Sequence, residues 1–125
     1  DRLILLFFHF GFFLKYYKKN HSKSESQELF DFFIRQIELS IREIGYGDVS
    51  VNKKMKQYIN LFYSIVENIE MWENLDYNSR SKVLGNFLNI SDNNKFFVDY
   101  FEKYRIYITK NTLNNFTKDI LNLKF

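Results

Sequence analysis

The sequence predicts an all-α fold, a single compact domain of five to six helices over residues 1–125. The chain has no proline and only four glycines, so little in it interrupts regular helices. Its apolar residues recur at three- and four-residue spacing almost throughout, which is the period of an amphipathic helix. A chain of this length buries about two-thirds of the surface that it exposes when unfolded, enough for one core. No internal repeat or flexible linker divides it.

The first helix is predicted from Arg2 to Lys19. Its apolar run, residues 3–14, contains twelve residues, whereas a helix that spans a bilayer needs about 20. We therefore expect a buried core helix, with a lipid-facing or client-facing surface helix as the alternative. Because the chain starts at Asp1 rather than methionine and enters this run at once, we also expect the natural N-terminus to lie upstream.

Two long helices follow. The first begins near Ser24 or Ser26, with Glu28 placed to interact with the dipole of the first turn, and it ends near Ile44. The other covers residues 51–72, where apolar residues repeat every seven positions. Its outer face is charged against its own dipole, since lysines stand at its start and glutamates toward its end. If these charges are placed for a partner, their contact with it would explain why the helix keeps an arrangement that lowers its own stability.

Three shorter helices complete the predicted domain, over residues 79–89, over residues 93–109 and from about residue 112 onward. Polar residues precede the last two helices and are expected to cap them, namely Ser91 or Asp92 for the fifth helix and Asn111 or Thr112 for the sixth.

Residues 45–50 separate the two long helices and hold two of the four glycines. Gly45 stands where a helix ends in the left-handed conformation, and Gly47 permits a second sharp turn. Asp48 or Ser50 can then cap the next helix. A nucleotide-binding loop is disfavoured, because such loops follow a strand and Asp48 would repel a phosphate. The segment is predicted to be a structural helix–turn–helix corner.

Residues suited to catalysis or metal binding are scarce. The chain has no cysteine, which excludes disulfides, thiolate metal sites and cysteine nucleophiles. The candidate bases are His9, in the apolar run, and His21, in a basic linker. A lone histidine in an apolar helix is more often bonded to a backbone carbonyl than paired with a nucleophile. No spacing typical of a metal site or cofactor loop is present. We predict no enzymatic activity, no metal and no cofactor.

The net charge of +3 comes from the first half of the chain, where residues 1–66 hold 10 Lys/Arg against 7 Asp/Glu. One basic cluster lies in residues 15–23. The other is predicted to form a partner-binding basic face of Arg42, Lys53, Lys54 and Lys56, which the corner aims outward. Such a face suits the phosphates of RNA or anionic lipid head groups, but it is equally the solvated coat of an ordinary helix. Sequence-specific DNA binding is not expected at this low charge.

Consecutive motifs in the chain resemble the ubiquinol-cytochrome c chaperone family. They are E-L-F-D-F-F at residues 28–33, I-R-E-I-G-Y-G-D-V-S-V at 41–51, and K-K-M-K at 53–56 followed by F-Y at 62–63. In that family an L-F-D-x-F-F helix leads into R-E-x-G-x-G-D-x-S-V and then into a helix rich in lysine and arginine. The order and spacing of these motifs carry the resemblance. The apolar run with His9 is also similar to the family's first helix.

The resemblance implies an all-helical, non-enzymatic assembly factor for respiratory complex III that binds newly made cytochrome b. Further partners that it implies are the ribosome or its RNA, a second assembly factor and the surface of the inner membrane. We expect a bacterial member at the inner face of the cytoplasmic membrane, with the matrix side of the mitochondrial inner membrane as the alternative. From the residues alone two other functions stay open. One is a general ribosome- or RNA-binding module, and the other is a structural subunit whose exposed aromatic residues close a dimer.

Overall fold

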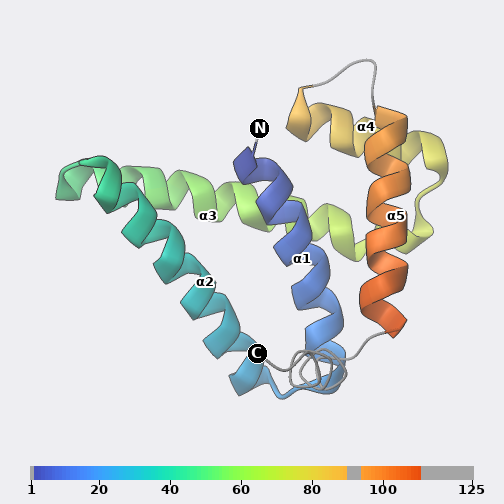
Figure 1. Ribbon diagram of the computed structural model, residues 1–125, viewed down its shortest axis with the longest axis horizontal. Coiled ribbons are helices and arrows are strands. Elements are labelled where there is room, and N and C mark those ends of the chain that lie inside the picture. The colour runs from blue at the N-terminus through green and yellow to red at the C-terminus, as the bar shows by residue number, and fades with distance from the viewer. Residues whose placement is uncertain (1, 90–93, 111–125) are drawn as a thin grey trace, which may run out of the picture.

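The structure, a computed structural model, describes residues 2–89 and 94–110 and confirms the all-α prediction (Figure 1). The described residues form five α-helices and one 3-10 turn, which are α1 (Arg2–Asn20), α2 (Lys23–Ile44), α3 (Asp48–Glu70), η1 (Trp72–Asn74), α4 (Tyr77–Leu88) and α5 (Asn94–Lys110). The predicted sixth helix and the predicted caps at Ser91, Asp92, Asn111 and Thr112 lie outside the described residues. Within the described ranges, no helix has the length and hydropathy needed to cross a bilayer.

Helix α1 lies in the middle of the fold, in front of α3 and with α2 and α5 on either side (Figure 1). It packs against all four of the other helices. Its fully buried side chains are Phe7, Phe8 and Phe12, and full burial of a phenylalanine contributes about 1.5–3 kcal/mol. One side of α1 therefore belongs to the core, as expected from its apolar run.

Gly11 brings the backbone of α1 close to α3. A Cβ atom at this position would lie 2.5 Å from Ile69 Cδ1 and 3.9 Å from Phe62 Cε1. Ile69 is fully buried, so its terminal methyl group has no solvent into which to move. Glycine is thus the residue that fits here without repacking of the core.

The start of α2 differs from the prediction. Its N-cap is Ser22, whose Oγ accepts a hydrogen bond from the Glu25 amide at 3.1 Å, while Glu25 Oε1 accepts one from the Ser22 amide at 3.2 Å. This capping box satisfies two amides that a helix start otherwise leaves free. The helix thus begins at Lys23, one residue before Ser24, the nearer of its two predicted starts, and both Ser24 and Ser26 lie inside it.

Helix α4 also begins earlier than predicted. Asp76 Oδ1 accepts a hydrogen bond from the Ser79 amide at 2.8 Å, and this bond lowers the pKa of the Asp76 carboxyl. Asp76 is therefore the N-cap, and the helix starts at Tyr77 rather than at Ser79.

An ion-pair network holds α5 beside α1, η1 and α4. Arg80 Nη1 donates to Glu102 Oε2 at 3.0 Å, and Arg105 also donates to Glu102. Glu73 accepts from the Tyr16 hydroxyl at 2.7 Å and lies 3.6 Å from Arg105 Nη1. The pKa of Glu102 is lowered chiefly by its hydrogen bond from Arg105, and that of Glu73 chiefly by its hydrogen bond from Tyr16. The network fixes where α5 stands relative to α1.

Candidate functional site

The side of α1 that faces away from α3 is apolar and aromatic. Leu6, Phe13 and Tyr17 follow the spacing of one helix face. This face lies between Phe10, which stacks on α2, and His9, which bonds to α5. Leu6 is 46% exposed, and Phe13 and Tyr17 are half-buried. From Leu3 to Leu14 the helix carries no aspartate, glutamate, lysine or arginine. We define the aromatic face as these residues with their neighbours, namely Leu6, Phe10, Phe13 and Tyr17 of α1, Phe33 of α2, and Tyr100 and Tyr104 of α5.

On the α5 side, His9 fixes this face by two hydrogen bonds. Its Nδ1 lies 2.6 Å from the Leu5 carbonyl oxygen, and its Nε2 lies 2.6 Å from the Tyr100 hydroxyl. Because a carbonyl only accepts, Nδ1 carries a proton and donates to the Leu5 carbonyl, while Nε2 is the hydrogen-bond partner of the Tyr100 hydroxyl. The Tyr104 hydroxyl donates to the His9 carbonyl at 3.2 Å, and burial raises the pKa of Tyr104 to about 12. The sequence interpretation of His9 as a residue bonded to the backbone is confirmed.

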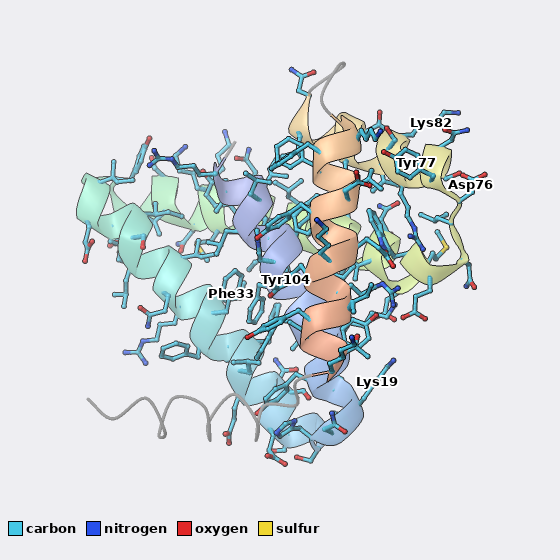
Figure 2. All side chains as sticks on the ribbon, turned by 45° about the vertical axis from the view of Figure 1, so that its right-hand side comes forward. Lys19, Phe33, Asp76, Tyr77, Lys82 and Tyr104 are labelled. Atoms are coloured by element: carbon cyan, nitrogen blue, oxygen red, sulfur yellow. The ribbon has the colours of Figure 1, made fainter. Side chains whose placement is uncertain are left out.

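On the α2 side, aromatic stacking fixes the face. The rings of Phe10 and Phe33 are stacked with their centroids 3.8 Å apart and their planes 12° from parallel. Phe33 also packs at 5.7 Å against Phe62 of α3. Figure 2 shows Phe33 of α2 and Tyr104 of α5 in the space between these two helices. Both sides of the aromatic face are therefore held by contacts to the core.

The α5 side continues beyond the aromatic face along one ridge. Phe96 precedes Tyr100 by one helical turn, is 66% exposed and stacks on it at 6.4 Å. Tyr100 in turn stacks on Tyr104 at 6.5 Å. The sequence analysis did not single out this ridge. The i, i+4, i+8 spacing of Phe96, Tyr100 and Tyr104 was the signal that could have found the ridge.

The corner between α2 and α3 forms as predicted in outline. Gly45 ends α2 in the left-handed conformation, with φ 104°, and its amide donates to the Arg42 carbonyl at 3.0 Å. The prediction for Gly47 was wrong, because its φ of −72° is accessible to any residue. The predicted caps Asp48 and Ser50 were wrong as well. Gly47 is the N-cap and makes no side-chain capping bond, so both residues lie inside the first turn of α3.

The predicted basic face is partly neutralised within the protein. Arg42 Nη1 lies 2.6 Å from Asp48 Oδ1 across the corner, and Arg42 Nη2 lies 3.3 Å from Glu38 Oε1. These contacts, above all the hydrogen bond to Asp48, raise the pKa of Arg42. Arg42 therefore belongs to the corner rather than to a free cationic surface.

The lysines of the basic face lie in the second and third turns of α3, which begins at Asp48. Lys54 Nζ lies 4.6 Å from the centre of the Tyr46 ring, a cation–π contact across the corner. Lys53 and Lys56 are exposed, three positions apart on the helix, and have no carboxylate partner among the described residues. They are the two residues of the predicted face whose charge is open to an external anion.

No group of three or more histidine, aspartate or glutamate side chains in residues 2–89 and 94–110 is arranged to hold a metal ion. His21, the second candidate base, bonds through Nδ1 to the Tyr17 carbonyl at 3.0 Å and stacks on the Tyr17 ring at 3.7 Å. Each histidine is thus engaged in a local helix contact.

The fold places the chain among all-α domains, and its aromatic and basic surfaces are of the kind that bind other macromolecules. The family model described as ubiquinol-cytochrome C chaperone matches residues 2–89, which contain α1 to α4. The chain belongs to this family, and membership gives it a chaperone role in the assembly of ubiquinol–cytochrome c reductase, respiratory complex III. No curated protein and no solved structure matches the chain.

Proposed function

We propose that this protein binds newly made cytochrome b, without catalytic turnover, and covers one of its transmembrane helices until partner subunits arrive. The observation that carries the proposal is the aromatic face, an uncharged strip of α1 set between two flanking helices. Membership of the family supports a role in complex III assembly. The aromatic face supports the choice of client, because its apolar side chains suit contact with a transmembrane helix.

A nascent membrane helix presents about 20 apolar residues. Outside the bilayer these residues gain free energy by burial, at about 25 cal/mol for each Å² of apolar surface removed from water. Aromatic side chains bury large areas and lose little conformational freedom on binding. Leu6 and Phe13 are seven positions apart on one face of α1, so a line through them runs nearly parallel to the helix axis. This arrangement suits contact with a second helix that packs lengthwise on the face.

Photocrosslinking in cells tests the proposal. A photoreactive phenylalanine analogue is placed at Leu6 or at Phe13, and at Gln57 as a matched control, since Gln57 is an exposed position of α3. We expect cytochrome b to be captured from Leu6 and Phe13 and not from Gln57. Equal capture from all three positions, or none from the first two, would contradict client binding at the aromatic face.

We propose further that the lysines at the start of α3 hold the chaperone near a polyanionic surface, either ribosomal RNA or the inner membrane. Changing Lys53, Lys54 and Lys56 to glutamate should weaken co-sedimentation with ribosomes or vesicles. Helicity should be retained, because lysine and glutamate have similar helix propensities and none of the three side chains is buried. Unchanged co-sedimentation would remove the basic residues from the proposal.

Treatment with ribonuclease separates the two surfaces. Loss of co-sedimentation after the treatment assigns the contact to RNA, and persistence assigns it to lipid. Co-sedimentation that requires RNA, together with no capture of cytochrome b, would favour a general ribosome-binding module. A mass that rises with concentration would favour a subunit that dimerises through exposed aromatic residues.

We place the protein at the inner face of a bacterial cytoplasmic membrane, or on the matrix side of the mitochondrial inner membrane. We also propose that residues 1–125 form one domain.

A further inference from the structure

A pocket of about 400 Å³ is lined by residues of α1, α2 and α3. This volume is within the range of about 300–1,000 Å³ that is typical of small-molecule sites. Its apolar wall consists of Leu14 of α1, Phe30 of α2, and Phe62 and Val66 of α3. None of the residues of the aromatic face is among the described lining of this pocket.

A buried hydroxyl group without a partner lines this pocket. Ser26 is only 5% exposed, and its Oγ makes no hydrogen bond with any described residue. Burial of a hydroxyl without a partner destabilises the folded state. Ser26 is one turn inside α2 and takes no part in the capping box of Ser22 and Glu25. The hydroxyl is therefore an unused hydrogen-bonding group in the wall of the pocket, and a rotation about χ1 of Ser26 is needed to present it to a ligand.

The mouth of the pocket is positively charged. Lys18 from the end of α1 and Lys23 from the start of α2 both line it, and no acidic residue is found among its described lining. Neither lysine has a carboxylate partner in the part of the chain that the structure describes. An apolar wall, one buried hydroxyl and two free cations together suit a ligand with a hydrocarbon chain and an anionic end.

We propose that this pocket binds a single-chain anionic amphiphile, with its hydrocarbon chain against Phe30, Phe62 and Val66 and its carboxylate or phosphate at Lys18, Lys23 and the Ser26 hydroxyl. The hydroxyl donates to the anion and so gains the partner that it lacks. The site uses the basic cluster of residues 15–23, which the proposed client binding leaves unused.

Calorimetric titration of the full chain tests this site with dodecanoate and with dodecyl phosphate as probes, and with dodecyltrimethylammonium as a cationic probe of the same chain length. We expect one molecule to bind per chain, and the cationic probe to bind at least about tenfold more weakly. Tighter binding of dodecanoate assigns the ligand to fatty acids, and tighter binding of dodecyl phosphate assigns it to lipid phosphates. Failure of both anionic probes to bind would overturn the proposal.

Ser26→Ala is the decisive variant. A hydrogen bond to a charged group is strong enough that its loss should weaken binding about tenfold or more. The variant should nevertheless unfold at the same urea concentration as the parent or a higher one, since it removes an unsatisfied buried group. Weaker binding therefore cannot be ascribed to misfolding. Unchanged affinity in Ser26→Ala would overturn the role of the hydroxyl and with it the proposed site.

The lysines provide a matched comparison. Lys18→Gln and Lys23→Gln should each weaken the binding of dodecanoate by about two- to fivefold and reduce its dependence on salt. Lys82→Gln and Lys103→Gln remove equal charge from exposed positions of α4 and α5 and should leave the affinity unchanged. Equal losses of affinity in both pairs would show that dodecanoate is attracted by net charge alone. That result would contradict a specific site in the pocket.

Discussion

Replacing Gly11 with alanine should force a rearrangement in the contact between α1 and α3. The new Cβ would lie 2.5 Å from Ile69 Cδ1, a distance that non-bonded carbon atoms, which are optimally about 3.5–4.0 Å apart, do not tolerate. The methyl group of Ile69 must therefore rotate, and Ile69 is fully buried, so the rotation disturbs other core side chains.

The size of the effect follows from two opposing contributions. Overpacking of a well-packed core costs about 1–3 kcal/mol, whereas alanine is better than glycine inside a helix by about 1 kcal/mol. We expect Gly11→Ala to lower the free energy of unfolding by up to about 2 kcal/mol. Ile69→Val removes the clashing Cδ1 atom and by itself should cost about 0.5–1.5 kcal/mol. In the double variant the two changes compensate, so its stability should be within about 1 kcal/mol of the parent.

Urea unfolding measures these four free energies. Trp72 is the only tryptophan and is fully buried, so its fluorescence reports the loss of the core. Gly47→Ala is the control, because nothing lies within 4 Å of a Cβ at that position, and it should not couple to Ile69→Val. Strictly additive effects of Gly11→Ala and Ile69→Val would refute the steric reasoning.

Three further changes test other contacts by the same urea assay. Gly45→Ala should cost about 1 kcal/mol and Gly45→Asn less, because asparagine tolerates the left-handed conformation better; equal costs would contradict the assigned role of φ. Ser22→Ala should cost about 0.5–2 kcal/mol through loss of the capping box, and no loss would place the start of α2 elsewhere. The pKa values of Glu73 and Glu102 are lowered in the folded protein, so their stabilisation is present above the unfolded pKa of about 4.3 and is lost as the pH falls through the folded values. Glu102→Gln should accordingly reduce the dependence of stability on pH between about 5 and 3, and an unchanged pH profile would show that Glu102 is not stabilised by its arginine partners.

The positions of the described helices could be predicted because they depend on local periodicity. The repeat of apolar residues is visible in the sequence whatever the helices pack against. The helix starts were less predictable, since several serines and aspartates stand near each one. At α2 the choice was settled by Glu25, whose side chain returns to the Ser22 amide. The capping pair alone would not have decided between Ser22 and Ser24, because Gln27 stands at the same spacing from Ser24.

The candidate site was less accessible from the sequence, because it depends on contacts between distant residues. His9 and Tyr100 are separated by 91 positions and bond at 2.6 Å, and no local pattern connects them. Arg42 was assigned to a partner-binding face because of its charge. Its pairing with Asp48 depends on the angle of the corner, which spacing alone does not determine.

The first helix is buried on one side, as the core-helix prediction expected, and exposes Leu6 on the other side; contact of that side with a client or with lipid stays a prediction. Gly11 allows α1 to pack closely on α3, and the resulting contact buries Phe7 and Phe12. The opposite side, with Leu6 and Phe13, is thereby left between α2 and α5 rather than in the core. Since both sides belong to one rigid helix, a change that moves α1 away from α3 also moves the aromatic face relative to its flanking helices. Client capture and core stability should therefore fail together in Gly11→Ala and recover together when Ile69→Val is added.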